Sequence, residues 1–367
     1  MSSLYIGVMS GTSVDGVDAV IMDFSDGMRS LGHSSLPFDP ALRQSLLKLN
    51  TPGDNELHLS ALAANQLALT YAHAVELLLR CTGLHPSDIA AIGAHGQTVR
   101  HQPGAYDGIG YTLQLNNPSL LAERTGIRVV ADFRSRDVAA GGQGAPLVPA
   151  FHQHVFAQAD STVAVLNIGG MTNLSILKNR EVIGFDCGPG NVLLDHWCHL
   201  HTGQLFDKDG AWAAQGQLNL PLLEQMMTET FFQQPFPKST GRDLFHAAWL
   251  NKHLQAFPSV NATDVQTTLT ALTAQVCANE VLRHAPQSKT LLVCGGGAHN
   301  QCLMQMLQQR LPGITVQSTD SHGLPPLQVE AAAFAWLARQ TCLNLSGNLP
   351  AVTGAGGERV LGCIYPA

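Results

Sequence analysis

The apolar positions predict a strand, a glycine-rich turn and a returning strand in each half of the chain. In the first half, 4–9 is a short apolar run, 10–16 is a turn, and 17–24 alternates polar with apolar residues. In the second half, the apolar run 163–168 precedes the glycine turn 169–173 and a further short apolar run. Two α/β domains of similar construction would give this repeated pattern.

Further apolar periodicities complete the two predicted domains. The additional elements are helices at 57–82, 267–284 and 329–339, a helix ending at 310, and strands at 89–94, 127–131, 181–185 and 290–294. The irregular, glycine-rich stretch 139–146 separates the repeats. We therefore expect one domain over 1–150, to which 345–367 can return, and a second over 151–345.

Composition narrows the class of protein. The chain has 367 residues, enough for two cores, and carries a net charge of −7 without a run of Lys or Arg, so a nucleic-acid partner is not expected. No stretch is apolar and long enough to span a membrane, and the amino-terminal residues lack the pattern of a signal peptide. The eight cysteines include no CxxC pair, which is typical of reduced thiols, so we expect a cytoplasmic protein.

Three glycine turns follow predicted strands, at 10–16, 169–173 and 295–300. Such turns expose backbone N–H groups and allow phosphate oxygens to approach where a Cβ would obstruct them. Any one of them could instead be a plain hairpin turn. Neither a Walker A motif nor GxGxxG occurs, so a P-loop or Rossmann nucleotide site loses its main support.

Two hairpin loops and a late triple-glycine turn resemble the actin/hexokinase/Hsp70 ATPases. The detailed motifs resemble one family within them, the anhydro-N-acetylmuramic acid kinases. The motifs that carry this resemblance are MSGTSVDGVD at 9–18, GAHGQT at 93–98, DFR at 132–134, NIGG at 167–170, FDCGPGN at 185–191 and PPLQVEA at 325–331. They span nearly the whole chain, which makes them more specific than a single loop.

The resemblance implies an α/β fold of two ribonuclease-H-like (actin-like ATPase) domains with a central cleft. It also implies ATP and Mg²⁺ as cofactors, a small-molecule sugar substrate, and a homodimer. The residues that it implies for ATP binding are Gly11, Thr12, Ser13, Val14, Asp15, Gly16, Val17, Asp18, Asn167, Gly169, Gly170, Gly295, Gly296, Gly297 and Asn300.

The position of the carboxylate expected to bind Mg²⁺ differs from that in the wider superfamily. The first loop of those proteins usually opens with Asp directly after the strand, whereas this chain has Met9 and Ser10 there and places Asp15 later. Asn167 stands where many relatives carry Asp in the second loop. We assign the metal to Asp15, through water; its alternative role is an Asp that forms the turn.

Asp186 follows an apolar strand and precedes a Gly-Pro-Gly-Asn turn. Its side chain is therefore expected at the carboxyl end of a strand, where open α/β folds bind ligands. One interpretation is a general base. The other is an N-cap of the helix that follows. The family resemblance favours the base.

Several polar residues are candidates for sugar binding. His95 and His101 lack a third partner at metal-ligand spacing, so a metal centre is not expected, and His95 with Gln97 fits a polar pair that contacts a sugar. Arg134 and Asp137 are candidate hydroxyl or carboxylate contacts, or else a solvated ion pair. Glu330 opens a helix, where an acid is commonly favourable; the resemblance makes it an acceptor for a sugar hydroxyl.

The implied substrate is 1,6-anhydro-N-acetylmuramic acid, in which O6 is bonded to C1. A kinase acting at O6 must break this bond, so we expect Asp186 to deprotonate a water that attacks C1 while O6 takes the γ-phosphoryl group. The product, N-acetylmuramic acid 6-phosphate, fits cell-wall recycling. Two alternatives remain open from the residues: a sugar kinase with a free hydroxyl acceptor, and a nucleotide-switched actin-like module without sugar chemistry.

Overall fold

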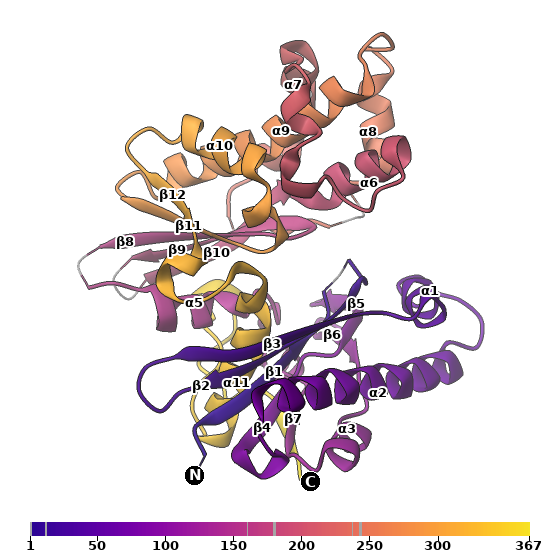
Figure 1. The fold of residues 1–367 in the computed structure, drawn as a ribbon, viewed down its shortest axis with the longest axis vertical. Coiled ribbons are helices and arrows are strands. Elements are labelled where there is room, and N and C mark those ends of the chain that lie inside the picture. Colours follow the sequence, from indigo (N-terminus) through magenta and orange to yellow (C-terminus); the bar gives the residue numbers. More distant parts are fainter. Residues whose placement is uncertain (1, 12, 160, 179–180, 237, 242–243) are drawn as a thin grey trace. The chain divides into compact units, whose positions relative to one another are not determined.

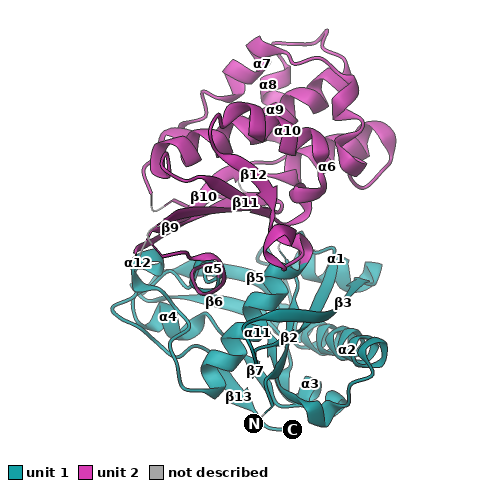
Figure 2. Cartoon of the chain, turned by 60° about the vertical axis from the view of Figure 1, so that its left-hand side comes forward, with its two compact units in different colours: residues 1–151, 328–367 teal, residues 152–327 magenta. Residues whose placement is uncertain are grey.

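The chain folds into two compact units. The computed structural model describes residues 2–11, 13–159, 161–178, 181–236, 238–241 and 244–367. Unit 1 comprises residues 1–151 and 328–367, and unit 2 comprises residues 152–327 (Figure 2).

Unit 1 is built on a six-stranded sheet with the order β13-β7-β4-β1-β2-β3 (Figure 1). Strands β1, β2 and β3, which are consecutive along the chain, form an antiparallel meander. Strand β4 runs parallel to β1, and β7 runs parallel to β4. The strands are β1 (Leu4–Met9), β2 (Gly16–Asp23), β3 (Arg29–Pro37), β4 (Ile89–Ala94), β7 (Val129–Ala131) and β13 (Cys363–Tyr365). A separate hairpin pairs β5 (Gln97–Pro103) with β6 (Gly110–Leu115).

Helices cover both faces of this sheet. The helices of unit 1 are α1 (Pro40–Lys48), α2 (Glu56–Thr82), α3 (Pro118–Thr125), α4 (Ser135–Ala139), α11 (Val329–Cys342) and α12 (Pro350–Thr353), with a 3₁₀ turn η1 (Pro86–Asp88). Ile6 and Val8 of β1 pack in the same apolar cluster as Leu67 and Tyr71 of α2. Side chains alternate along a strand, so Gly7 faces the other way, towards α11.

Unit 2 repeats the strand order of unit 1 on a five-stranded sheet, β10-β9-β8-β11-β12. An antiparallel meander is again followed by strands parallel to its first strand. The strands are β8 (Thr162–Ile168), β9 (Met171–Lys178), β10 (Glu181–Pro189), β11 (Thr290–Cys294) and β12 (Thr315–Ser318). The repeat predicted from the two glycine turns is therefore present in the sheet topology.

The helices that pack on this sheet enclose a second apolar core, which contains Leu166, Ile168, Phe185, Leu272 and Leu303. The helices of unit 2 are α6 (Asn191–Thr202), α7 (Leu220–Met226), α8 (Ala247–Leu254), α9 (Ala262–His284) and α10 (Gln301–Arg310). Helix α5 (Val148–Phe156) contains the passage from unit 1 to unit 2. The 3₁₀ turns are η2 (Lys208–Gly210), η3 (Ala213–Gln215), η4 (Thr230–Gln233), η5 (Gly296–His299), η6 (Thr319–His322) and η7 (Pro326–Gln328).

The return of the chain to unit 1 differs from the expected boundary at 345. The chain re-enters unit 1 at Gln328, and α11 packs on β1 and β4. Glycines on the sheet make this helix contact possible, because an added Cβ at Gly7 or Gly93 would lie within 2.0 Å of a backbone oxygen of α11. Two glycines on adjacent strands thus let this helix approach the sheet closely. Composition alone does not reveal this long-range contact.

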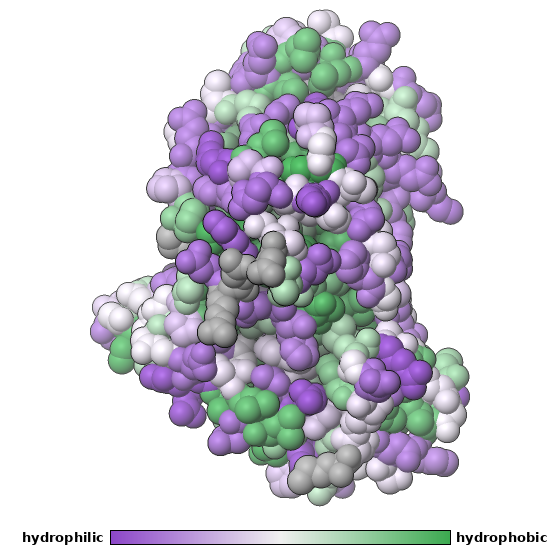
Figure 3. Space-filling model, turned by 90° about the vertical axis from the view of Figure 1, so that its left-hand side faces the viewer, coloured by the Kyte–Doolittle hydropathy of each residue, from purple (hydrophilic) through white to green (hydrophobic). Residues whose placement is uncertain are grey.

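Among the described residues, no helix has the length and apolar character needed to cross a membrane. The face of the molecule in Figure 3 shows polar and apolar side chains interspersed over its surface.

Candidate active site

The loop between β1 and β2 is held in place by side chains from elsewhere in unit 1. Ser10 is buried and hydrogen-bonds the Tyr71 hydroxyl at 2.8 Å, and its hydroxyl lies 3.2 Å from the Gly96 carbonyl oxygen. Gln97 Nε2 donates to the Gly11 oxygen at 3.1 Å, and Arg43 Nε donates to the oxygen of Val14. The loop is thus attached to α2, to α1 and to the turn that carries His95 and Gln97.

The predicted ATP residues of this loop differ in what they can contact. Thr12 lies outside the described residues. Asp15 is exposed, whereas Val14 is buried with φ 56°, a left-handed conformation that is strained for a β-branched residue. Val17 is buried in β2, and Asp18 on the same strand pairs with His33 at 3.1 Å. Direct ATP contact is therefore better suited to Gly11, Ser13, Asp15 and Gly16 than to Val17 or Asp18.

The buried His95 pairs with the partly buried Arg134 beside this loop. Arg134 donates to His95 Nε2 through Nη2 at 2.9 Å and Nε at 3.1 Å. Because a guanidinium cannot accept a hydrogen bond, Nε2 is the acceptor and Nδ1 carries the ring proton, beside the backbone of Ser10 and Gly96. Burial, reinforced by the charge of Arg134, holds the pKa of His95 well below its ordinary value. His95 is therefore neutral and fixed, with both ring nitrogens directed at neighbouring groups of the protein.

Two carboxylates oppose the effect of desolvation on the pKa of Arg134. Burial lowers the pKa of Arg134 to about 10, and the charges of Glu330 and Asp137 oppose this shift. Glu330, in the first turn of α11, is partly buried. The structure thus brings His95, Arg134 and Glu330 close to one another in unit 1.

Asp137 differs from the expectation of a direct sugar contact. Its side chain is completely buried, and Oδ1 accepts hydrogen bonds from Asn348 at 2.7 Å and Thr353 at 2.8 Å. Oδ2 accepts from the backbone N–H of Gly144. Both oxygens are therefore engaged in fixing the glycine-rich segment that carries Gly144, whose carbonyl in turn accepts from Arg134. Asp137 therefore fixes the segment whose Gly144 carbonyl binds Arg134.

In unit 2 the turn at 169–170 follows the end of β8 and is hydrogen-bonded to the start of α6. The carbonyl of Gly170 accepts from the N–H groups of Gly190 and Val192, and Gly169 accepts from Asn191. A Cβ at Gly170 would meet no heavy atom within 4 Å, so the protein itself leaves this position open.

The late glycine turn packs on the same strand end. A Cβ at Gly295, which has φ 79°, would lie 2.4 Å from Asn167 Oδ1, and one at Gly297 would lie 2.2 Å from Ile168. Gly296 is more open, with Asn191 Nδ2 at 3.5 Å from the same ideal position. Asn300, predicted to bind ATP, has its side-chain oxygen engaged as the N-cap of α10.

Asp186 stands in a row of polar residues across the sheet. It lies opposite Asn173 of β9, which in turn lies opposite Asn167 of β8. The flanking residues Phe185 and Leu174 point into the helix-covered core, so these three polar side chains occupy the other face. Asn173 was missed as a site candidate; the adjacent glycine turn was its only sequence signal.

The carboxylate of Asp186 is held at one oxygen. Oδ2 accepts hydrogen bonds from Ser239 Oγ at 2.8 Å and from the Thr240 N–H at 3.0 Å. Within the described part of the chain, no donor is recorded for Oδ1. Burial raises the pKa of Asp186, against the opposing effects of Thr240, Ser239 and the charge of Lys238. A carboxylate with a raised pKa and one free oxygen suits proton abstraction.

The strand around Asp186 is longer than expected. β10 continues to Pro189, with a register shift between Asp186 and Gly188, so Asp186 lies within the strand. The N-cap of α6 is Gly190, which excludes the alternative role of Asp186 as its cap. Sequence reasoning also missed Ser239 and Thr240, because their pairing with Asp186 is distant along the chain.

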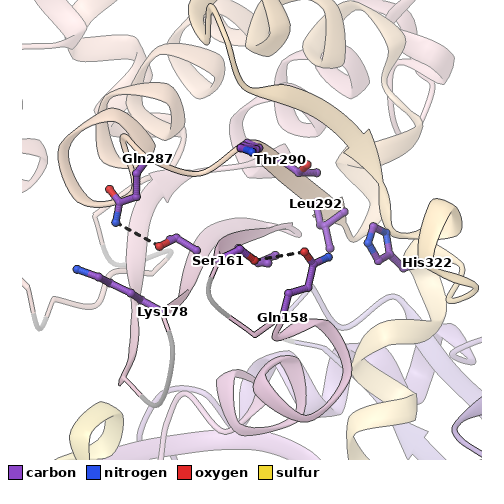
Figure 4. A pocket seen from close by; sticks show the side chains of 10 residues that line it. Gln158, Ser161, Lys178, Gln287, Thr290, Leu292 and His322 are labelled. Atoms are coloured by element: carbon purple, nitrogen blue, oxygen red, sulfur yellow. Dashed lines mark hydrogen bonds between the residues drawn. The ribbon is translucent and has the colours of Figure 1, made fainter.

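A cavity of about 500 Å³ in unit 2 is separate from these residues. It opens where β8 and β11 begin, among Gln158, Lys178, Gln287 and His322 (Figure 4). No predicted site residue lines it, since those of unit 2 lie at the opposite ends of the same strands.

Comparisons with known proteins agree with the motifs. The family model described as anhydro-N-acetylmuramic acid kinase matches residues 3–367. A protein named anhydro-N-acetylmuramic acid kinase from Albidiferax ferrireducens is 58% identical, with 100% of each chain covered. One of the same name from Variovorax paradoxus is 59% identical, with 99% of each covered.

A solved structure supports the fold alone. The activator of the 2-hydroxyisocaproyl-CoA dehydratase from Clostridium difficile, with bound ADPNP, aligns with a TM-score of 0.50 at 11% identity. The alignment covers 93% of this chain and 96% of that one. Together with the shared strand order of the two sheets, it confirms the expected α/β architecture of two ribonuclease-H-like, actin-like ATPase domains.

Proposed function

We propose, because the chain belongs to the anhydro-N-acetylmuramic acid kinase family, that Asp186 is the base of its ATP-dependent ring-opening phosphorylation. The substrate is 1,6-anhydro-N-acetylmuramic acid, and the products are N-acetylmuramic acid 6-phosphate and ADP. The observation that carries the assignment is the Asp186 carboxylate, held at Oδ2 by two donors and raised in pKa by burial.

The reaction requires one proton acceptor and one phosphoryl acceptor. Asp186 takes a proton from water, whose oxygen bonds to C1 of the sugar. The C1–O6 bond breaks, and its electron pair stays on O6, which bonds to the γ-phosphorus as the bond to ADP breaks. A glycosidase normally uses a second carboxylic acid to protonate the leaving oxygen. Here the phosphoryl group takes that place, so a single carboxylate is sufficient.

The glycine turns are the proposed phosphate contacts. Gly11 of unit 1 and Gly169 and Gly170 of unit 2 leave space where a larger side chain would obstruct an anion, since a Cβ at each would meet no heavy atom nearer than 3.6 Å. Ser13 and Gly16 complete the proposed loop of unit 1. Kinases of this fold use ATP, and the open space at Gly170 supports a ligand there, since packing within the protein does not require glycine at that position.

Asp15 is the proposed partner of Mg²⁺. Among the residues that the structure describes, no group of three or more His, Cys, Asp or Glu side chains could hold a metal ion. An exposed lone carboxylate nevertheless fits this ion, which commonly binds one or two carboxylates together with waters and substrate phosphates. Bound Mg²⁺ would neutralise charge on the transferring phosphoryl group.

The sugar contacts are proposed in unit 1. His95 orients Arg134, which offers a partly buried cation, and Glu330 offers an acceptor for a hydroxyl. Gln97 is buried, and none of the described residues donates to its Oε1, which suits a hydroxyl donor. The lactyl carboxylate of the muramic sugar is the natural partner of a guanidinium.

The decisive test is Asp186→Asn. The amide is nearly isosteric but cannot accept the proton, so kcat should fall by about 10²–10⁴-fold while both ligands still bind. The assay is ADP release with the anhydro sugar, together with calorimetry for binding. A fully active Asp186→Asn enzyme would exclude this residue as the base.

Labelled water tests the bond changes independently. In ¹⁸O-water the early product should carry label on the anomeric oxygen and none in the phosphate ester; product incubated in labelled water controls for exchange. A kinase with a free hydroxyl acceptor would incorporate no label during turnover. An actin-like switch without sugar chemistry would hydrolyse ATP at a rate independent of any sugar.

We further propose a cytoplasmic homodimer, carried by the family resemblance and by the need for an ATP pool. Sedimentation equilibrium tests the stoichiometry: a single species of monomer mass across micromolar concentrations would contradict it. Cell fractionation tests the compartment.

A further inference from the structure

A buried ion pair lies behind the segment that holds Asp186. Lys238 Nζ is 2.9 Å from Glu280 Oε1, and the two side chains are only 2% and 3% exposed. We propose that this pair is a positioning device for the catalytic carboxylate: Lys238 and Glu280 fix the segment whose next two residues bind Asp186. The proposal rests on Asp186 being the base.

The segment runs along the free edge of β10. Asp186 donates its backbone N–H to the Lys238 oxygen at 3.1 Å. Beyond Lys238, the Ser239 hydroxyl and the Thr240 N–H both donate to Asp186 Oδ2. Ser239 is exposed, whereas Lys238 is buried, so the backbone sends one side chain to the carboxylate and the other into the core. A shift at Lys238 therefore moves two of the donors that set the direction of the carboxylate.

Lys238 also contacts the strand next to the base. Its ammonium lies 5.9 Å from the centre of the Phe185 ring and 4.9 Å from that of Phe231. Phe185 immediately precedes Asp186 and stacks on Phe236 at 5.7 Å. The cation thus belongs to the segment that orients the acid and contacts the strand that carries it.

A purely structural role would not require these charges. Replacing both members of a buried ion pair by apolar residues of similar volume is often neutral or stabilising, because desolvation offsets their attraction. Glu280 sits on α9, with the Arg283 guanidinium at 3.5 Å and His284 Nε2 at 3.2 Å as further neighbours. The carboxylate of Glu280 therefore anchors Lys238 to the longest helix of this unit, while the charge of Lys238 lowers the pKa of Asp186 against its burial.

The main test is the double variant Lys238→Met with Glu280→Leu, studied in the full chain. We expect it to fold and to keep the wild-type KM for ATP, with kcat reduced on the order of 10–100-fold, as misplacement of a reacting group does. We also expect a change in the acid limb, the fall of kcat/KM at low pH as the base becomes protonated. This limb should move to higher pH, because the cation that lowers the pKa of Asp186 is gone. A folded double variant with wild-type kcat and an unmoved limb overturns the proposal.

A second variant keeps the test valid if the double variant does not fold. Glu280→Gln is nearly isosteric and retains an acceptor for Lys238, but leaves the ammonium without its counter-ion. The acid limb should then move to lower pH, opposite to the double variant; an unmoved limb contradicts the proposal. Arg283→Met is the matched control, since it also removes a cation that pairs with Glu280 but lies on α9 rather than in the segment that binds Asp186, and it should leave kcat and the limb unchanged.

Two results separate this proposal from the assignment of the base. An inactive Asp186→Asn enzyme combined with an unmoved limb in the Lys238 and Glu280 variants retains the base and removes the positioning role. Ser239→Ala, an exposed change that deletes one donor to Oδ2, should shift the limb upward if the pathway through the segment is correct. An unchanged profile in Ser239→Ala contradicts that pathway.

Discussion

Replacing Gly7 by Ala tests whether the close approach of α11 to the sheet sets the position of Glu330. The ideal Cβ at Gly7 would lie 1.7 Å from the oxygen of Ala331 and 2.6 Å from the nitrogen of Ala335. Both are backbone atoms of α11, so no side-chain rotation relieves the overlap. The helix or the strand must move by more than about 1 Å in a close-packed interior.

The cost should fall at the upper end of that for overpacked cores. Such substitutions typically destabilise by about 1–3 kcal/mol, and a clash with backbone in a rigid helix–sheet contact favours about 3 kcal/mol or more. For a unit of this size, that corresponds to a fall in the unfolding midpoint of about 6–12 °C. Because Glu330 adjoins Ala331, a displacement of this size should also reduce kcat/KM for the sugar by up to about 100-fold.

Thermal unfolding by circular dichroism and steady-state kinetics measure the two effects. Gly53→Ala is the matched control: its Cβ meets no atom within 4 Å, and the change should alter stability by less than about 1 kcal/mol. If Gly7→Ala unfolds within 2 °C (roughly 1 kcal/mol) of the wild type, the packing argument is wrong. A large loss of stability with unchanged sugar kinetics in the folded enzyme would separate α11 placement from Glu330 function.

Three further predictions follow from single contacts. Gly170→Val should leave stability nearly unchanged, since the space is open, but weaken ATP binding in calorimetry; unchanged affinity removes this turn from the site. Glu330→Gln should raise KM or lower kcat for the sugar more than it affects ATP, because a carboxylate accepts hydroxyl hydrogen bonds more strongly than an amide; wild-type sugar kinetics would reduce Glu330 to a helix-start acid. Burial lowers the pKa of His152 to about 3, so below about pH 6.5 only the unfolded chain binds this proton, and stability falls by at most about 1.4 kcal/mol per pH unit down to the folded pKa; His152→Gln should flatten the pH dependence of urea unfolding between about pH 6.5 and 4.5 by one proton, and an equal slope would contradict it.

Local sequence patterns predicted the helices and strands whose ends coincide with glycine or other turn residues. The strand 89–94 is present as predicted, and the helix predicted at 57–82 spans Glu56–Thr82, ending at Gly83 in a left-handed conformation. Short or partly polar strands such as β3 and β12 were not predicted, because their burial depends on neighbours rather than on their own periodicity. The return of the chain at Gln328 escaped prediction for a similar reason: Gly7 and Gly93 accommodate α11 only once distant segments meet.

The residues of the candidate site show the same difference between local and long-range signals. The glycine turns and Asp186 could be identified because each interrupts an apolar strand. The partners of these residues could not: Ser239 and Thr240 reach Asp186 across more than fifty residues of sequence. Asp137 shows the converse error, since a polar residue in a loop was expected to face a ligand, whereas the fold encloses it completely. Polar type suggests chemistry, but burial and hydrogen-bond saturation decide the role.

The repeated topology also explains why the proposed base lies in unit 2. Both sheets place an antiparallel meander beside parallel strands, so the third strand of each meander occupies the same outer position. In unit 1 that strand, Arg29–Pro37, contains no Asp or Glu. In unit 2 it is β10, where the register shift after Asp186 and the segment at 238–240 together fix a carboxylate on the sheet face opposite the helical core. The duplicated scaffold thus offers two equivalent strands, and only the second carries a carboxylate that could act as the base.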